Sequence, residues 1–208
     1  MIYPKLQYEV ILPESFDPAK ESLPMIVFLR DIPYGKIPEI FFSLESKAGV
    51  RAVVIAPECS TGYDYTNVPF EIADAIDEAA EKYRVDTDKI SITGFGIGGF
   101  GVWEFICQFA DMLSSAVPVG GGGMSWRADS IGTLPVWAFH GSMDSVVHKI
   151  HSQEMTSRII LAGGDAHVTL LPELDHGIAD TVYESGILKW MTERTRNEVA
   201  EVLNYEKT

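Results

Sequence analysis

Short continuous apolar runs alternate along this chain with longer stretches in which apolar residues recur every three or four positions. Continuous runs of five or six apolar residues are typical of strands that are covered on both faces. The longer stretches have the periodicity of amphipathic helices. The runs predict strands over residues 25–29, 50–56, 115–119 and 135–139. Strands are also predicted over the alternating, β-rich residues 6–12, the β-branched run 91–93 and residues 167–171. The periodic stretches predict helices over residues 37–48, 70–83, 102–107, 146–161 and 180–203.

This alternation predicts the fold class α/β, with a mostly parallel central sheet and helices on both faces. The chain has 208 residues, 46% of them hydrophobic, and shows no repeat or low-complexity tract, so we expect a single domain over residues 1–208. Ligands of such sheets bind at the carboxyl ends of the strands. Residues that follow positions 29, 93 and 139 are therefore the first candidates for a site.

The charge of the chain restricts its partners. A formal net charge of -14 and a pI near 4.7 oppose binding to nucleic acid or to an anionic membrane surface. The amino-terminal residues lack the pattern of a signal peptide, and no apolar run reaches the length of a membrane span, so we expect a cytoplasmic protein. Two cysteines, Cys59 and Cys107, form no disulfide framework. His148 and His151 lack a third metal ligand, and we expect neither a metal nor a cofactor.

The most informative stretch is the β-branched run at 91–93, which breaks into glycines before a helical pattern. It indicates a strand, a sharp turn and a helix. Gly94 and Gly98 stand where the Gly-x-Ser-x-Gly nucleophile elbow has its glycines, because strand and helix backbones approach closely there. The middle residue is Gly96, which carries no nucleophile. A glycine-rich phosphate-binding turn is the alternative interpretation, but that motif usually follows the first strand.

Two further residues stand in the order that such an elbow requires, an acid and then a histidine. Asp144 lies in the loop that follows the predicted strand 135–139. His176 follows the last predicted strand and precedes the last helix. We expect Asp144 to bind Nδ1 of His176 and so to direct Nε2 toward the elbow. Each residue alone has a structural explanation, and it is their joint order that favours a dyad. His140, at the end of a strand, is expected to be structural.

On these residues the chain resembles the α/β-hydrolase superfamily, in particular the small esterases of the dienelactone-hydrolase and phospholipase/carboxylesterase type. The resemblance covers residues 25–190 and is strongest over 86–104 and 135–147. In the first of these segments the family commonly shows D-x-D-[RK]-I-x-[IL]-T-G-x-S-x-G-G. The resemblance implies that Asp144 is the acid, that His176 is the base and that Gly96 holds the position of the nucleophile.

A second departure affects the oxyanion hole. After the strand 25–29 the resemblance implies a His-Gly turn, but Arg30, Asp31, Ile32 and Pro33 follow here. The oxyanion-hole positions are then Asp31, Ile32 and the backbone N–H of Ile97. An Asp31 carboxylate would oppose the negative charge of a tetrahedral intermediate, and Pro33 has no N–H to donate.

The residues that could line a pocket are Arg30, Tyr63 and Trp126. The segment 120–134 stands where relatives often insert a cap domain. It is too short for a sizeable cap, so we expect a shallow pocket.

Three functions fit these observations. The first is an esterase-like protein that has lost serine-dependent hydrolysis and uses the His176–Asp144 dyad and a shallow pocket to bind a small-molecule ligand or a partner. The second is an active carboxylic-ester hydrolase in which His176 activates water, or in which the dyad serves non-hydrolytic chemistry. The third is an ordinary carboxylesterase whose natural serine has been replaced by Gly96. The sequence leaves the ligand or ester substrate and the oligomeric state open.

Overall fold

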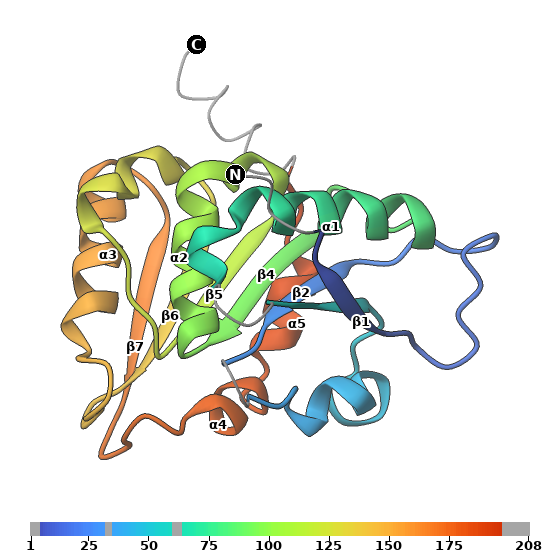
Figure 1. Ribbon diagram of the computed structural model, residues 1–208. Helices are drawn as coiled ribbons and strands as arrows, with labels where there is room; N and C mark the ends of the chain where they lie inside the picture. Colours follow the sequence, from blue (N-terminus) through green and yellow to red (C-terminus); the bar gives the residue numbers. More distant parts are fainter. Residues whose placement is uncertain (1–4, 32–34, 60–63, 197–208) are drawn as a thin grey trace, which may run out of the picture.

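The computed structural model describes residues 5–31, 35–59 and 64–196 of the chain, and its centre is a seven-stranded sheet. The strand order is β1-β3-β2-β4-β5-β6-β7 (Figure 1). β1 is antiparallel to β3, and every other neighbouring pair is parallel. This arrangement confirms the predicted α/β class with a mostly parallel sheet. The strands are β1 (Gln7–Ile11), β2 (Met25–Leu29), β3 (Val53–Glu58), β4 (Ile90–Phe95), β5 (Ser115–Val119), β6 (Val136–Gly141) and β7 (Ala166–Leu171).

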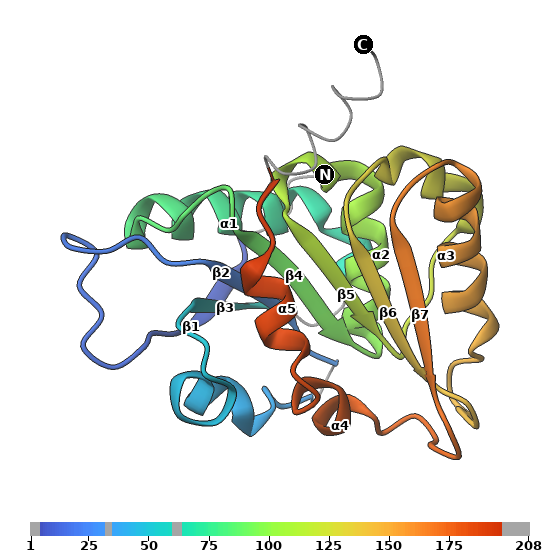
Figure 2. The same cartoon turned by 180° about the vertical axis from the view of Figure 1, so that it is seen from behind.

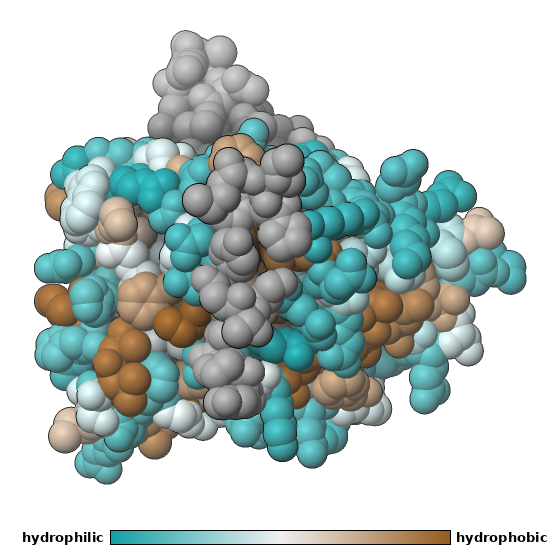
Figure 3. Space-filling model, in the orientation of Figure 1, coloured by the Kyte–Doolittle hydropathy of each residue, from teal (hydrophilic) through white to brown (hydrophobic). Residues whose placement is uncertain are grey.

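Helices cover both faces of the sheet. The helices α1 (Pro69–Tyr83), α2 (Ile97–Phe109) and α3 (Ile150–Leu161) lie on the face that is turned to the viewer in Figure 1. The short helices α4 (Ala179–Tyr183) and α5 (Ile187–Glu193) lie on the opposite face, which Figure 2 shows from behind. No helix among the described residues is long and apolar enough to cross a membrane. Figure 3 shows hydrophilic residues over much of the face that bears α1, α2 and α3, with apolar residues in separate areas.

Both faces of the central strands are buried, which explains why these strands are continuous apolar runs. All five residues of β2 are buried, and they alternate between two hydrophobic clusters. Met25, Val27 and Leu29 pack in the cluster beneath α1, α2 and α3. Ile26 and Phe28 pack in the cluster beneath α4 and α5. Because successive side chains of a strand point to opposite faces, one apolar run supplies both cores.

Two predicted helices differ from the observed elements. Residues 37–48 form a 3₁₀ helix, η1 (Glu39–Ser43), followed by a single π-helical turn, η2 (Leu44–Ala48), in place of one α-helix. The predicted helix 180–203 is divided into α4 and α5 at Gly186, whose φ of 91° is left-handed and interrupts the helix. Residues 197–203 lie outside the described residues.

The helix predicted from residue 146 begins at Ile150 instead. The backbone N–H groups of Val146 and Val147 donate to the Asp144 carboxylate, so these residues belong to the loop that surrounds it. The parallel strands β2, β4, β6 and β7 end at one edge of the sheet. The loops that carry Asp31, Gly96, Asp144 and His176 all begin at that edge.

Candidate active site

The turn between β4 and α2 is sharp and depends on its glycines. Gly96 has φ 59° and ψ -119°, a backbone conformation that L side chains rarely adopt. A Cβ at Gly94 would lie 2.6 Å from the carbonyl oxygen of Gly98, and a Cβ at Gly98 would overlap the carbonyl oxygen of Leu29. The α2 helix therefore starts in direct backbone contact with β2 and β4. This close approach has the geometry of a nucleophile elbow.

The carboxylate of Asp31 fills the space that a side chain at position 96 would need. A Cβ at Gly96 would lie 2.6 Å from Oδ1 of Asp31 and 2.8 Å from its Cγ. The backbone N–H of Ile97 donates to the same Oδ1 at 3.0 Å. This amide, at the first residue of α2, is the one that stabilises an oxyanion in hydrolases with an intact elbow. The structure thus places a negative charge of the chain itself on that donor.

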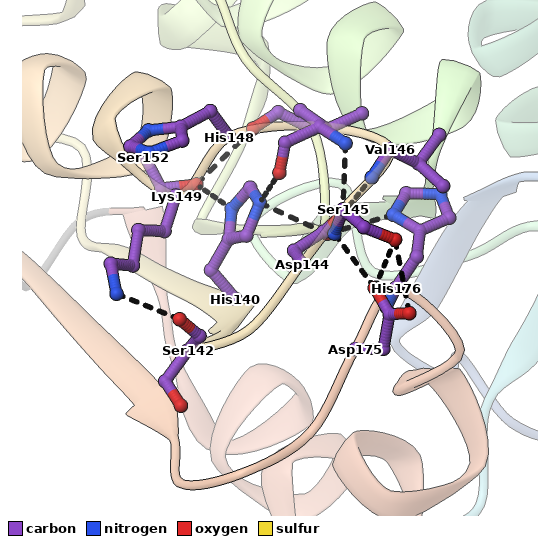
Figure 4. A network of polar contacts seen from close by, with 12 residues as sticks. His140, Ser142, Asp144, Ser145, Val146, His148, Lys149, Ser152, Asp175 and His176 are labelled. Carbon is purple, nitrogen blue, oxygen red and sulfur yellow. Dashed lines mark hydrogen bonds and ion pairs between the residues drawn. The ribbon is translucent and has the colours of Figure 1, made fainter.

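The carboxylate of Asp144 is held by four groups, which Figure 4 shows with their neighbours. Its Oδ1 accepts the backbone N–H groups of Val146 (2.9 Å) and Val147 (2.8 Å). Its Oδ2 lies 2.8 Å from Nδ1 of His176 and 3.2 Å from Nε2 of His140. The side chain is fully buried. Burial alone would raise the pKa of Asp144, but the hydrogen bonds from His176, Val147 and Val146 outweigh it and hold this pKa below its ordinary value.

The contact with Asp144 determines which nitrogen of His176 carries the proton. A carboxylate only accepts hydrogen bonds, so Nδ1 of His176 is the donor. In the neutral ring Nε2 is then an acceptor and has the tautomer of a general base. The His176 ring packs on the ring of Phe95, with 4.9 Å between their centroids, and 16% of its side chain is exposed. The structure therefore brings the two predicted dyad residues together beside the β4–α2 turn.

His140 contacts Asp144 and the loop that carries it. Its ring is fully buried, and Nε2 donates to the carbonyl oxygen of Val147 at 2.8 Å. Nδ1 is then the acceptor, and the hydroxyl of Ser152 lies 2.8 Å away. Burial lowers the pKa of His140, with smaller opposing effects from Val147 and Asp144. These contacts hold the loop that carries Asp144, in line with the structural role expected for His140.

Asp175 connects the two loops of the dyad, a role that the sequence analysis did not assign. Its Oδ1 accepts the backbone N–H of Ser145 at 2.7 Å and the backbone N–H of His176 at 2.8 Å. The Ser145 hydroxyl is 2.9 and 3.0 Å from the two carboxylate oxygens. The hydrogen bonds from Ser145 and His176 lower the pKa of Asp175. The sequence could have indicated this role, because Asp175 directly precedes His176 and Ser145 directly follows Asp144.

Two of the three residues expected to line a pocket, Arg30 and Trp126, lie in the described part of the chain. Arg30 donates to Glu9 of β1 at 3.3 Å and lies 3.9 Å from Glu58 of β3. Trp126 is 73% exposed on the 3₁₀ helix η5 (Ser125–Ile131). Tyr63, like Ile32 and Pro33, lies outside the described residues.

No cap domain lies between β5 and β6. The segment that joins these strands contains η5, which packs beside α2 and α3. Arg127 of η5 binds Glu104 of α2, and Arg158 of α3 binds Asp129 of η5. Within the part of the chain that the structure describes, no group of three or more His, Cys, Asp or Glu residues could hold a metal ion.

One cavity, of about 240 Å³, opens beside Asp31. It lies between the end of β2, the turn that precedes η1 and the start of α4. Phe95, which contacts His176, forms part of its wall. The cavity is lined by Phe28, Asp31, Gly35, Lys36, Pro38, Phe95, Ala179 and Asp180.

The parallel sheet, the sharp turn between β4 and α2 and the His176–Asp144 pair at its carboxyl edge define an α/β-hydrolase fold. The chain belongs to the dienelactone hydrolase family, whose model matches residues 44–206.

Two solved structures share this fold. A thermostable esterase has a TM-score of 0.80 and 22% identity over 91% of this chain and 59% of its own. The uncomplexed acylaminoacyl peptidase of Pyrococcus horikoshii has a TM-score of 0.71 and 17% identity over 91% of this chain and 38% of its own.

A curated relative is the bifunctional acetylxylan esterase/xylanase XynS20E of Neocallimastix patriciarum. It is 23% identical over 101 residues, which are 46% of this chain and 15% of that protein. The chain therefore spans only part of each of these proteins.

Proposed function

We propose that this chain is an esterase-like α/β-hydrolase that has lost serine-dependent hydrolysis and binds a small-molecule ligand at the His176–Asp144 site. One observation carries the proposal. The Asp31 carboxylate takes both the space of a side chain at Gly96 and the hydrogen bond of the Ile97 amide. A nucleophile is absent, and an oxyanion would meet a carboxylate at the donor that should stabilise it.

The fit between Asp31 and Gly96 also bears on the origin of the glycine. A serine at position 96 would place its Cβ within 2.6 Å of Asp31, so this aspartate suits a glycine better than a serine. If the natural residue were serine, the Asp31 carboxylate would have to move away from the position in which it accepts the Ile97 amide. The contact therefore favours a natural loss, and the sequence of the native gene tests it directly.

The intact dyad favours a second candidate function, an ester hydrolase that uses water in place of serine. His176 has the tautomer of a general base, and Asp144 is held by two further backbone donors. Hydrolases without a complete triad retain about 10³ to 10⁴-fold acceleration over water from binding and the oxyanion hole. Part of this acceleration depends on the Ile97 amide, which here donates its hydrogen bond to Asp31.

The partners in this proposal follow from the charge of the chain. The net charge of -14 opposes nucleic acid and anionic membranes. We place the protein in the cytoplasm, with a small ligand as its partner. The cavity beside Asp31 and the absence of a cap suit a ligand that is small and partly exposed.

Hydrolysis of 4-nitrophenyl acetate tests the proposal, with His176→Ala as the key variant. We expect the wild type to be no faster than His176→Ala. The matched control is His167→Ala, which removes a histidine from the exposed surface of β7. Turnover that His176→Ala abolishes and His167→Ala retains would contradict the proposal and establish the water-dependent hydrolase.

A further inference from the structure

The cavity beside Asp31 combines apolar walls with a small number of charges. Phe28, Pro38 and Phe95 supply apolar surface. Two carboxylates, Asp31 and Asp180, face one ammonium group, Lys36, so the lining has a net negative charge. At about 240 Å³ the cavity is smaller than the roughly 300 Å³ at which ligand pockets usually begin. It fits a ligand of about the size of one aromatic ring with a short substituent.

Hydrogen-bond acceptors outnumber donors among the charged side chains of the described lining, where Lys36 is the one cation beside Asp31 and Asp180. The Ile97 N–H, which would bind an anion, is already bonded to Oδ1 of Asp31. His176 uses its Nδ1 proton for Asp144, which leaves Nε2 as an acceptor. A carboxylate or oxyanion ligand would meet the charge of Asp31 and would find the amide donor occupied. A ligand that donates hydrogen bonds meets in Asp31 a carboxylate, which only accepts them.

We propose that this site selects a small ligand with a cationic, hydrogen-bond-donating head, such as a primary ammonium group on an apolar body, and excludes carboxylates. This inference rests on the proposed function, because it assigns the ligand class of the same site. The ammonium group donates to Asp31, and the apolar body lies against Phe28 and Phe95, whose ring faces attract cations. The strongly negative net charge of the chain also favours the approach of cations.

Three probes with the same phenyl ring test the inference at pH 7.5: benzylammonium, benzyl alcohol and benzoate. Binding is followed by the ¹H–¹⁵N shift of Ile97, the amide that is bonded to Asp31. Charge-assisted hydrogen bonds contribute more than neutral ones, so we expect benzylammonium to bind at least roughly tenfold more tightly than benzyl alcohol. Benzoate should not bind.

Two variants of Asp31 identify the group responsible. Asp31→Asn keeps the shape and removes the charge, and it should abolish the preference for benzylammonium. Asp31→Ala frees the Ile97 amide and should allow benzoate to bind. Asp74→Asn, on the exposed side of α1, changes the net charge equally and should leave the preference intact.

Equal binding of benzylammonium and benzyl alcohol by the wild type, or binding of neither, would overturn the inference. A preference that survives in Asp31→Asn would overturn it as well. The proposed function is judged separately by the His176-dependent turnover of 4-nitrophenyl acetate. If the wild type shows neither turnover nor a preference for benzylammonium, the proposed ligand class is wrong and the proposed loss of hydrolysis still stands.

Discussion

Asp31 and Gly96 follow different strands, β2 and β4, yet the side chain of one occupies the space that the other leaves open. We therefore expect the two residues to be energetically coupled. Asp144 lies at the same edge of the sheet, but its position does not depend on the residue at 96. Its carboxylate receives hydrogen bonds from its own loop and from His176, so it is held independently of position 96.

A double-mutant cycle measures the coupling of Gly96 and Asp31. Gly96→Ala should destabilise the wild type both through its sparsely populated backbone conformation, which costs about 1–3 kcal/mol, and through the contact with Asp31. In an Asp31→Gly background only the backbone cost remains. We expect a coupling free energy of about 0.5–3 kcal/mol in urea unfolding. Additive effects of the two substitutions would show that Asp31 does not fill this space.

His140 makes stability depend on pH. Burial lowers its folded-state pKa below the unfolded value of about 6.5. Between these two values the unfolded chain binds more protons, so stability is complete above pH 6.5 and falls as the pH decreases toward the folded-state pKa. The His140→Gln variant should lose less stability than the wild type between pH 7 and pH 5. The exposed His167→Gln should retain the wild-type slope, and equal slopes for all three proteins would refute this prediction.

At the scale of elements, the site depends on how closely α2 approaches β2. Gly98 lies on the first turn of α2 against the carbonyl group of Leu29, so the helix can start where it does only if this residue has no side chain. The same approach places the Ile97 amide beside Asp31 at the end of β2. The strand, the turn and the helix thus position the site as one unit.

Gly98→Ala tests this packing. The added methyl would overlap backbone atoms of β2, which cannot move aside as a side chain can, so we expect a loss of about 1–3 kcal/mol or more. Gly177→Ala is the matched control, because no atom lies within 4 Å of its Cβ position and its φ is not positive. Urea unfolding should separate the two variants clearly. Similar stabilities would mean that α2 and β2 are not in the contact described.

For the molecule as a whole, one sheet joins two cores. The cluster beneath α1, α2 and α3 contains Trp103, and the cluster beneath α4 and α5 contains Met191. Each central strand contributes side chains to both, so neither core can be lost without the other. A single domain therefore remains a prediction, which the cooperativity of unfolding tests.

A change in one core should therefore unfold the whole molecule. Met191→Ala removes a fully buried side chain of α5 and should cost about 2–5 kcal/mol. Far-UV circular dichroism and tryptophan fluorescence should shift together along urea, as in a two-state transition. Two separate transitions would contradict the single cooperative domain.

The sequence predicted the central strands well because their apolar runs are buried on both faces. It also predicted that Asp144 and His176 would meet, since the loops after parallel strands share one edge. The helix at 37–48 was wrong because Ile40, Phe41 and Leu44 have a spacing that 3₁₀ and π turns also satisfy. The sequence could not predict the directions of the side chains of Arg30 and Asp31. In the structure Asp31 accepts the Ile97 amide, whereas Arg30 donates to Glu9.

Restoring a nucleophile at position 96 tests whether the chain has lost serine-dependent hydrolysis. Gly96→Ser combined with Asp31→Gly supplies the hydroxyl and clears both its space and the Ile97 amide. Labelling by a fluorophosphonate and turnover of 4-nitrophenyl acetate report on the new serine. We expect a silent wild type, a double variant that is labelled at residue 96 and active only while His176 is present, and a less active Gly96→Ser variant. A wild type with His176-dependent turnover, or a folded double variant with neither labelling nor turnover, would contradict this expectation.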